Sequence, residues 1–300
     1  FEPVAQSAGG AASATGWNEG SANIPTQSAA ALGDSNSGMH LTIAILAALL
    51  QREHPGKGSY VYQSMQDAVI NLCRIKLRDQ LMLDNLGALP FYAVYPNYKW
   101  GKAIPRSENS EGGQVIGWTY KAKGWETDPN AYVYIVIQNK NKSWETIANT
   151  MGHPEWATDE RFKDWEHRQL HKQEIYPLIE SYTKNYDKYE LTKKLEEAGI
   201  LVGPVLDWHE LENDPDLNED GTLVKINQGG NRGEFKTVGV PFTMSNYKPT
   251  YKRVPDLGEN NKEILSSLGY DPEQIEELVA KGVISKVEKP HNPRTKVIKD

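Results

Sequence analysis

Asp34 is the residue of this chain whose position best suits covalent chemistry, because small residues lead up to it and a strongly apolar segment follows it. Apolar residues recur at helical spacing between Met39 and Leu50, which predicts a helix that begins within a residue or two of Asp34. A carboxylate at a helix N-terminus is stabilised by backbone N–H groups and by the helix dipole. Two interpretations follow: an N-cap, which spacing alone favours, or a nucleophile that forms covalent acyl intermediates.

Other candidate groups are weaker. His167 and His171 have the spacing of a metal-binding pair, but their polar surroundings favour a solvated helix face. Cys73 lies on an apolar helical stripe, which is typical of a buried small side chain. The glycine pair Gly112-Gly113 suits a lid or an oxyanion-binding turn, although a plain surface turn has the same composition. The usual hydrolase, zinc-protease, Walker and C-x-x-C motifs are absent from the sequence.

Composition limits the class of protein. The 300 residues are 38% hydrophobic and 24% charged, which is typical of a soluble globular protein. A net charge of -7 argues against nucleic acid as a partner. The apolar run from Leu41 to Leu50 is far shorter than the roughly 20 residues of a membrane-spanning helix. A single cysteine and the lack of a signal peptide indicate a cytoplasmic protein.

The periodicity predicts an α/β protein with an α+β insert. We expect irregular turns over residues 7–33, rich in Gly, Ala and Ser, and a loop over 87–117. Asp271 and Pro272 predict the start of the last helix. Helices are expected at 35–53, 64–86, 143–151, 158–168, 173–183, 188–198, 260–268 and 272–281, and strands at 59–63, 132–138, 200–206, 223–226 and 237–243.

Several stretches together resemble the class III CoA-transferases, in particular the formyl-CoA:oxalate CoA-transferases. The most specific are ALGDSNSGMHL at 31–41, MQDAV at 65–69 and RIKLRDQ at 74–80. AQSAGGAA at 5–12, KGWETD at 123–128, GPV at 203–205 and LGE at 257–259 extend the likeness over residues 1–285. The resemblance favours the nucleophile interpretation of Asp34 over the cap.

The resemblance implies a Rossmann-like large domain, incomplete here, and a small α+β domain, in two subunits interlocked as a homodimer. Residues 1–63 would be the C-terminal part of the N-terminal large domain, 64–90 a linker helix, 91–205 the small domain, and 206–300 a segment returning to the large domain. The chain opens at Phe1 in patterned sequence without Met, so we expect an N-terminally truncated protein. The missing part would supply a glutamine beside the nucleophile and most groups that hold the CoA phosphates.

The resemblance also implies a reaction. Asp34 would attack formyl-CoA to give a mixed anhydride, which CoA thiolate converts to an aspartyl-CoA thioester. Oxalate would then take over the CoA, giving oxalyl-CoA and formate. The substrates would be CoA thioesters and a small dicarboxylate, with no cofactor, no metal, no nucleic acid and no membrane.

Further site residues follow from the same resemblance. Glu2 matches an active-site glutamate, and Gly112 and Gly113 match the end of a glycine loop that shields the anhydride from water. Here Ser110 and Glu111 precede that pair where relatives carry more glycine. The expected substrate-binding residues are Gln114, Gly33 and Ser35.

The sequence is compatible with several alternatives. The donor could be acetyl-CoA or succinyl-CoA, or the acceptor another acid. The chain could also be a racemase-like or inactive CoA-binding relative, or an interaction protein in which Asp34 only caps its helix. Two more departures from relatives are a longer segment between Gly16 and Gly33, which begins Trp17-Asn18-Glu19-Gly20, and Asn260 in place of a histidine.

Overall fold

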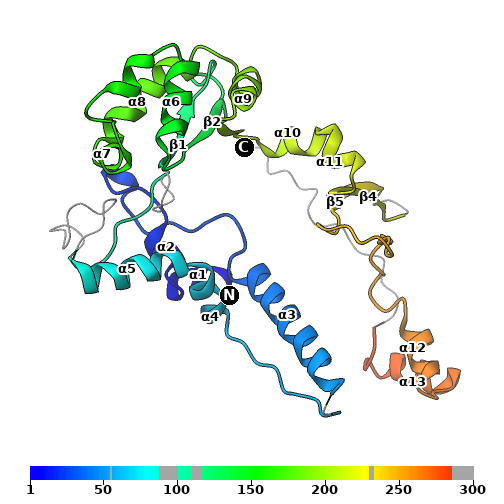
Figure 1. Ribbon diagram of the computed structural model, residues 1–300. Coiled ribbons are helices and arrows are strands. Elements are labelled where there is room, and N and C mark those ends of the chain that lie inside the picture. The colour runs from blue at the N-terminus through cyan, green and yellow to red at the C-terminus, as the bar shows by residue number, and fades with distance from the viewer. Residues whose placement is uncertain (55, 88–100, 110–115, 230–232, 286–300) are drawn as a thin grey trace. The chain divides into compact units, whose positions relative to one another are not determined.

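The computed structural model describes residues 1–54, 56–87, 101–109, 116–229 and 233–285. The chain divides into two compact units, Phe1–Val205 and Leu206–Asp300, and each is described by itself. Figure 1 gives the order of the elements along the chain.

The first unit begins with helices that pack through small side chains. Ala5 and Ala11 form a buried cluster with Val69, and a Cβ atom added at Gly9 would lie 2.5 Å from that valine. Gly10 has a φ of +86°, which separates the first two helices. Residues 7–33 are therefore partly helical and not irregular throughout, because small residues let short helices approach closely. These helices are α1 (Glu2–Ala8), α2 (Ala11–Ala14), the short 3₁₀ turn Gly20–Ala22, α3 (Asp34–Arg52), α4 (Met65–Leu72) and α5 (Arg74–Leu86).

Two predictions for this region were wrong. The helix expected over 64–86 is divided at Cys73, whose φ of -82° and ψ of 13° leave the helical region. The strand expected at 59–63 is not a strand, and Tyr60 there is 91% exposed. A strand needs a neighbour for its backbone hydrogen bonds, and the described residues provide none for this segment.

The remainder of the first unit is an antiparallel sheet in the order β1-β2-β3. Its central strand alternates, with Val133, Ile135 and Ile137 fully buried and the residues between them half-buried. The register pairs Tyr120 with Val133, and Ile135 with Val202. The first strand was not predicted: it begins at the last two residues of the expected loop, where Gly117 and the short length of the run obscured its pattern. The strands are β1 (Ile116–Lys121), β2 (Tyr132–Ile137) and β3 (Leu201–Pro204).

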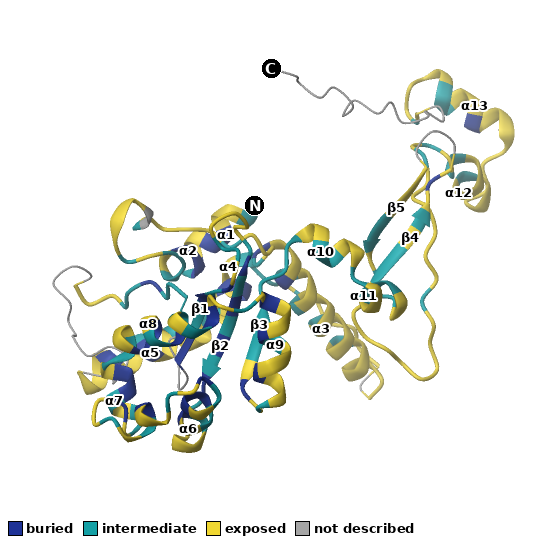
Figure 2. Cartoon of the chain, turned by 90° about the horizontal axis from the view of Figure 1, so that it is seen from above, coloured by how far each residue is buried: buried dark blue, intermediate teal, exposed yellow. Residues whose placement is uncertain are grey.

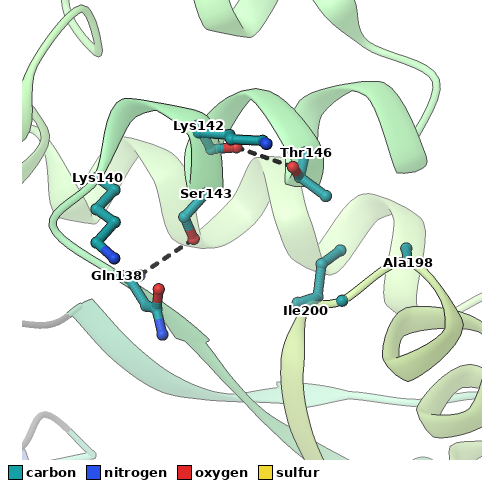
Figure 3. Close-up of a pocket in the computed structure, with 8 residues that line it drawn as sticks. Gln138, Lys140, Lys142, Ser143, Thr146, Ala198 and Ile200 are labelled. Atoms are coloured by element: carbon teal, nitrogen blue, oxygen red, sulfur yellow. Dashed lines mark hydrogen bonds between the residues drawn. The ribbon is translucent and has the colours of Figure 1, made fainter.

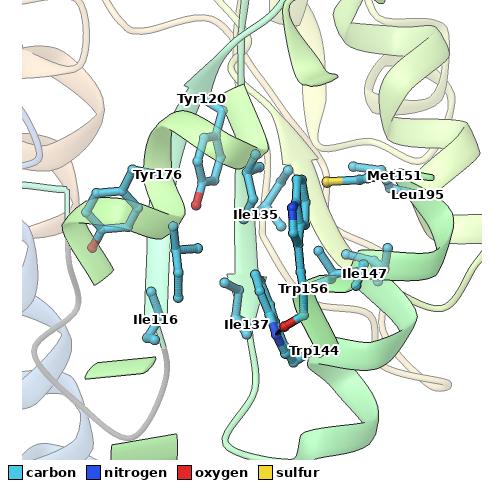
Figure 4. Close-up of a cluster of buried hydrophobic side chains, with 14 of the residues drawn as sticks. Ile116, Tyr120, Ile135, Ile137, Trp144, Ile147, Met151, Trp156, Tyr176 and Leu195 are labelled. Atoms are coloured by element: carbon cyan, nitrogen blue, oxygen red, sulfur yellow. Dashed lines mark hydrogen bonds between the residues drawn. The ribbon is translucent and has the colours of Figure 1, made fainter. Parts of the chain in front are cut away.

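Helices cover the buried face of this sheet, and their aromatic and aliphatic side chains form the main core (Figure 4). Trp144 is 1% exposed, lies with its ring 6.1 Å from that of Trp156, and donates its indole N–H to the Trp156 carbonyl. The helix expected at 158–168 is shorter, because Asp164 caps a helix that begins only at Trp165. The elements are α6 (Asn141–Thr150), the 3₁₀ turn Pro154–Thr158, α7 (Trp165–Leu170), α8 (Lys172–Thr183) and α9 (Lys188–Glu197).

The second unit contains short helices and a two-stranded antiparallel sheet. Asp207 and Asp271 each begin a helix with a capping box, and the start at Asp271 is where the sequence predicted it. The last strand lies earlier than expected, because Val238 pairs with Leu223 and ends the ladder. The elements are α10 (Trp208–Asn213), α11 (Pro215–Glu219), β4 (Leu223–Asn227), β5 (Glu234–Val238), α12 (Asn261–Ser267) and α13 (Pro272–Ala280).

Helix α3 exposes most of its surface (Figure 2), although much of that surface is apolar. Met39, Ile43, Leu46 and Leu50 are 60%, 64%, 60% and 70% exposed. An exposed apolar surface of this extent is typical of an interaction site. Across the described parts of the chain, no helix has both the length and the apolarity needed to cross a membrane.

Candidate active site

Asp34 is the first residue of α3, and Gly33 occupies the N-cap position. The helix has no side-chain cap from its own N-cap residue, and the Asp34 carboxylate is exposed. The predicted helix start is therefore confirmed, whereas the interpretation of Asp34 as the N-cap was wrong. Its carboxylate does not make the hydrogen bond that defines a capping side chain.

The cap comes instead from Glu2, which lies on α1. One carboxylate oxygen, Oε1, accepts hydrogen bonds from the Gly33 N–H at 3.0 Å and from Nε2 of Gln6 at 2.6 Å. The other, Oε2, accepts from the Asp34 N–H at 2.5 Å. The backbone N–H groups of Gly33 and Asp34, and then the Gln6 amide, lower the pKa of the Glu2 carboxyl. Glu2 is therefore an ionised group held directly against the backbone of Asp34.

Gly33 allows this contact because it has no side chain. An added Cβ would lie 2.9 Å from the Ala5 Cβ and 2.9 Å from Glu2 Oε2. Its φ of -78° and ψ of -60° are open to any residue, so the requirement for glycine is steric. Close approach between α1 and the start of α3 is what brings the two carboxylate-bearing residues together.

The other N–H groups of the first turn already have acceptors. Ser35 and Asn36 donate to the Ala31 carbonyl at 3.1 and 3.4 Å. An oxyanion that developed beside Asp34 would therefore find these amides already bound to other acceptors in this structure. The two best-placed amides, those of Gly33 and Asp34, are occupied by Glu2.

Asn36 fastens the start of α3 to the neighbouring helix. The side chain is 4% exposed, and its Nδ2 donates to the Ala68 carbonyl on α4 at 3.0 Å. Neither Asn36 nor Gln6 was predicted from the sequence to have a role. The sequence feature that could have identified both residues is a polar side chain among small or apolar neighbours. A polar side chain that is buried in such a place needs hydrogen-bond partners.

The structure brings together Asp34, Gly33, Ser35 and Glu2 of the predicted site. Gly112, Gly113 and Gln114 lie outside the described residues. The described residues just before these three are hydrogen-bonded to the segment between Gly16 and Gly33. Asn18 Nδ2 donates to the Arg106 carbonyl at 2.9 Å, and the Arg106 N–H donates back to Asn18 Oδ1 at 3.0 Å.

A cavity of about 830 Å³ lies beside this connection. Trp17, Trp118, Glu108 and Lys172 line it, and burial lowers the pKa of the Lys172 ammonium. Trp118 is held by stacking on Tyr176, with 4.1 Å between the ring centroids. Glu19 also lines the cavity. Because acidic and basic side chains line it together, the charge of the cavity does not favour either anionic or cationic ligands.

A smaller cavity, of about 270 Å³, lies at the start of α6 (Figure 3). Lys140 and Lys142 line it, and the Ser143 hydroxyl accepts a hydrogen bond from the Gln138 N–H at 3.3 Å. Both lysines are exposed, and no side chain caps this helix. We assign no ligand to this cavity.

The remaining candidates have structural partners. His167 bonds Asp164 through Nδ1 at 2.7 Å, and His171 bonds Glu174 in the same way at 2.6 Å. Within the described ranges, no group of three or more potential metal ligands occurs. Cys73 is half-buried, and burial raises the pKa of its thiol. The interpretation of the histidines as surface residues fits these contacts.

Comparison with known proteins identifies the family. Residues 1–261 match CoA-transferase family III. The chain is 49% identical over 275 residues to a formyl-CoA:oxalate CoA-transferase from Shigella sonnei and to one from Escherichia coli O139:H28. The match covers 92% of this chain and 65% of each relative, so the chain spans about two thirds of the length of these relatives.

Solved structures support the same fold. A CAIB/BAIF family protein from Brucella suis superposes with a TM-score of 0.66 at 22% identity, over 89% of this chain and 62% of that protein. The Rv3272 protein from M. tuberculosis gives a TM-score of 0.64 at 19% identity, over 87% and 62%. The family match over most of the sequence, with relatives at 49% identity, establishes that this chain belongs to CoA-transferase family III.

Proposed function

We propose that the protein transfers CoA from formyl-CoA to oxalate, giving oxalyl-CoA and formate. The observation that carries the proposal is the exposed carboxylate of Asp34 at the start of α3, within the sequence stretch that resembles the family's nucleophile motif. Relatives named formyl-CoA:oxalate CoA-transferase share 49% of their aligned residues with this chain, which supports the choice of substrates.

In the proposed reaction, an Asp34 oxygen attacks the formyl carbonyl carbon and CoA leaves as its thiolate, which forms a formyl–aspartyl anhydride. The thiolate then attacks the aspartyl carbonyl and releases formate, leaving an aspartyl-CoA thioester. An oxalate oxygen displaces the thiolate to form a second anhydride. Attack of the thiolate on the oxalyl carbonyl gives oxalyl-CoA and restores the Asp34 carboxylate. A carboxylate suits these steps because its acyl derivatives remain reactive toward the thiolate.

Glu2 and the glycine loop have supporting roles in this proposal. The Glu2 carboxylate binds the backbone at Asp34 and thereby keeps the nucleophile's own carboxylate out of capping hydrogen bonds. Gly33 gives Glu2 the room to do so, and Ser35 follows the nucleophile. Gly112, Gly113 and Gln114 are proposed to shield the anhydride and bind substrate, on the basis of the resemblance alone.

We further propose that residues 1–63 and 206–300 belong to a Rossmann-like large domain and 91–205 to a small domain, joined by 64–90. The assembly proposed is an interlocked homodimer in the cytoplasm. Support comes from the apolar surface of α3, where Ile43, Leu46 and Leu50 are each at least 60% exposed. The rest of the large domain and the second subunit would cover that surface.

The nucleophile can be tested by trapping. Incubation of the protein with formyl-CoA and then hydroxylamine should place a hydroxamate on Asp34, which peptide mass spectrometry locates. Asp34→Ala should abolish both the tag and transfer. Asp67→Asn, which alters another aspartate in the first turn of a neighbouring helix, is the control and should retain both. A hydroxamate on another residue, or transfer by Asp34→Ala, would refute the assignment.

The substrates can be tested separately. Transfer rates with acetyl-CoA and succinyl-CoA as donors should be far below the rate with formyl-CoA. Exchange of an α-proton of an acyl-CoA with solvent deuterium would indicate a racemase-like activity instead. Neither outcome depends on the trapping result, so chemistry and substrate choice are decided independently.

A further inference from the structure

Gln6 is buried at the centre of the contacts that hold Glu2, although no motif assigned it a role. It lies one turn after Glu2 on α1 and is 1% exposed. Its Nε2 donates to Glu2 Oε1 at 2.6 Å, to the Ser28 carbonyl at 3.1 Å and to the Ala30 carbonyl at 3.3 Å. Its Oε1 accepts from the Ser28 N–H at 2.9 Å.

The contacts with Ser28 fix which way the amide faces. Gln6 both accepts from the N–H and donates to the C=O of the same residue, as one peptide group does with another in a sheet. Because the Ser28 N–H requires an oxygen, the amide nitrogen must face Glu2. A carboxylate at position 6 would lack the donors, and an apolar side chain would lack both groups.

Glu2 depends on this arrangement because it is bound from two sides. The backbone amides of Gly33 and Asp34 approach from α3, and Gln6 approaches from α1 itself. Without Gln6, the carboxylate would be held mainly by the backbone at Gly33 and Asp34, which is the segment that it has to position. A glutamate side chain has three rotatable bonds, so a second fixed donor removes much of its freedom.

We propose that Gln6 is a positioning residue for the transfer reaction, which holds the Glu2 carboxylate on the first amides of α3 and so sets the backbone that carries Asp34. The inference rests on the proposed function. Gln6 acts through Glu2 and touches no substrate. The segment that leads from Ser28 into α3 is fixed by the same amide, so a single side chain joins the two parts of the site.

Few charged groups surround Glu2. Helix α2 carries none, α4 carries Asp67, and α3 carries Asp34 and His40 near its start. The pKa of the Glu2 carboxyl is lowered by hydrogen bonds, first from the Gly33 and Asp34 backbone and then from Gln6. Removal of the Gln6 donor should therefore raise that pKa and move the acidic limb of activity to higher pH.

The test compares Gln6→Met with Gln66→Met in the intact enzyme. Gln66 is the matched control, because its Nε2 donates to the Ala8 carbonyl at the end of the same helix, at 3.0 Å, and does not contact Glu2. Gln6→Met should lower kcat about tenfold or more with KM within about twofold, since a hydrogen bond to a charged group is lost. As the pH is lowered, Gln6→Met should begin to lose activity at a higher pH than the wild-type enzyme does. Gln66→Met should match wild type in both kinetics and pH dependence.

A second variant guards against loss of folding. Gln6→Glu should be impaired at neutral pH by repulsion between two carboxylates, and should regain activity relative to Gln6→Met as the pH falls and the introduced carboxyl becomes a donor. A drop in kcat with an unmoved acidic limb, or wild-type kinetics in Gln6→Met, would overturn the inference. If Asp34→Ala retained transfer, the proposed function itself would fail, whatever the Gln6 variants do.

Discussion

Alanine substitutions at Gly33 and Gly38 should change the stability of the protein in opposite directions. Both glycines lie at the start of α3, five positions apart. A Cβ at Gly33 would lie 2.9 Å from both the Ala5 Cβ and Glu2 Oε2, closer than real Cβ contacts come. At Gly38 an added Cβ meets no described atom within 4 Å. The pair therefore separates a steric requirement from an ordinary helix preference.

The magnitudes follow from these contacts. Forcing a methyl group into a filled space costs about 1–3 kcal/mol, and replacing glycine by the less favourable alanine at an N-cap adds to that cost. At an open helical position, alanine is more stable than glycine by roughly 0.5–1 kcal/mol. For a protein of this size, each kcal/mol shifts the melting temperature by about 2–4 °C. The steric cost alone should therefore make Gly33→Ala lower Tm by roughly 2–12 °C, and Gly38→Ala should raise it by about 1–4 °C.

Melting followed by circular dichroism, at equal protein concentration for all variants, measures both shifts. Gly33→Ala should also reduce transfer activity, because the added methyl displaces the Glu2 carboxylate from the backbone of Asp34. Equal destabilisation by the two substitutions would show that the Gly38 surface is filled. A neutral Gly33→Ala would refute the close contact between α1 and α3.

The other predictions concern separate parts of the molecule. Glu2→Gln should be less stable than wild type at pH 7, and the difference should close on acidification below 4.5, because the pKa of Glu2 is lowered in the folded state and its contribution disappears as the carboxyl protonates. Asn18→Ala should cost about 1–3 kcal/mol in urea unfolding, since the N–H and the carbonyl of Arg106 both lose a hydrogen bond to the Asn18 side chain; a change below about 0.5 kcal/mol would contradict this. Trp144→Ala should cost about 3–5 kcal/mol in the same assay, because it empties the core beneath the sheet. Leu46→Glu should convert the proposed dimer to monomer or aggregate in light scattering, and an unchanged dimer would exclude this surface from the interface.

The sequence predicted the elements whose signals are local. The alternating strand that contains Ile135 and the capped helix after Asp271 both occur where expected. The errors have a different origin. The segment around Tyr60 has the composition of a strand, but strand formation depends on a partner that local pattern cannot supply. The helices before Gly33 were missed because their alanines and glycines are packed by contacts from elsewhere, such as that between Gly9 and Val69.

In the candidate site, too, the features that depend on neighbouring residues could be predicted, whereas contacts between distant parts of the chain could not. The position of Asp34 at a helix start could be inferred from spacing, and Glu2 was selected only through the family resemblance. The connection between them could not be inferred, because Glu2 reaches an amide 32 residues later in the chain. Rules for helix caps consider the neighbouring residues, and they assigned Asp34 a role that Glu2 performs. Gln6 had no signal beyond its polarity.

This division of roles between two carboxylates has a chemical consequence. A capping aspartate donates electron density to the amides that it binds, and one of its oxygens is then less available as a nucleophile. At the start of α3 the amides of Gly33 and Asp34 are satisfied by Glu2, so the Asp34 carboxylate has no capping hydrogen bond to give up. The helix start is thus stabilised by one carboxylate while the next remains exposed. A nucleophile in such a place can be acylated without uncapping the helix that carries it.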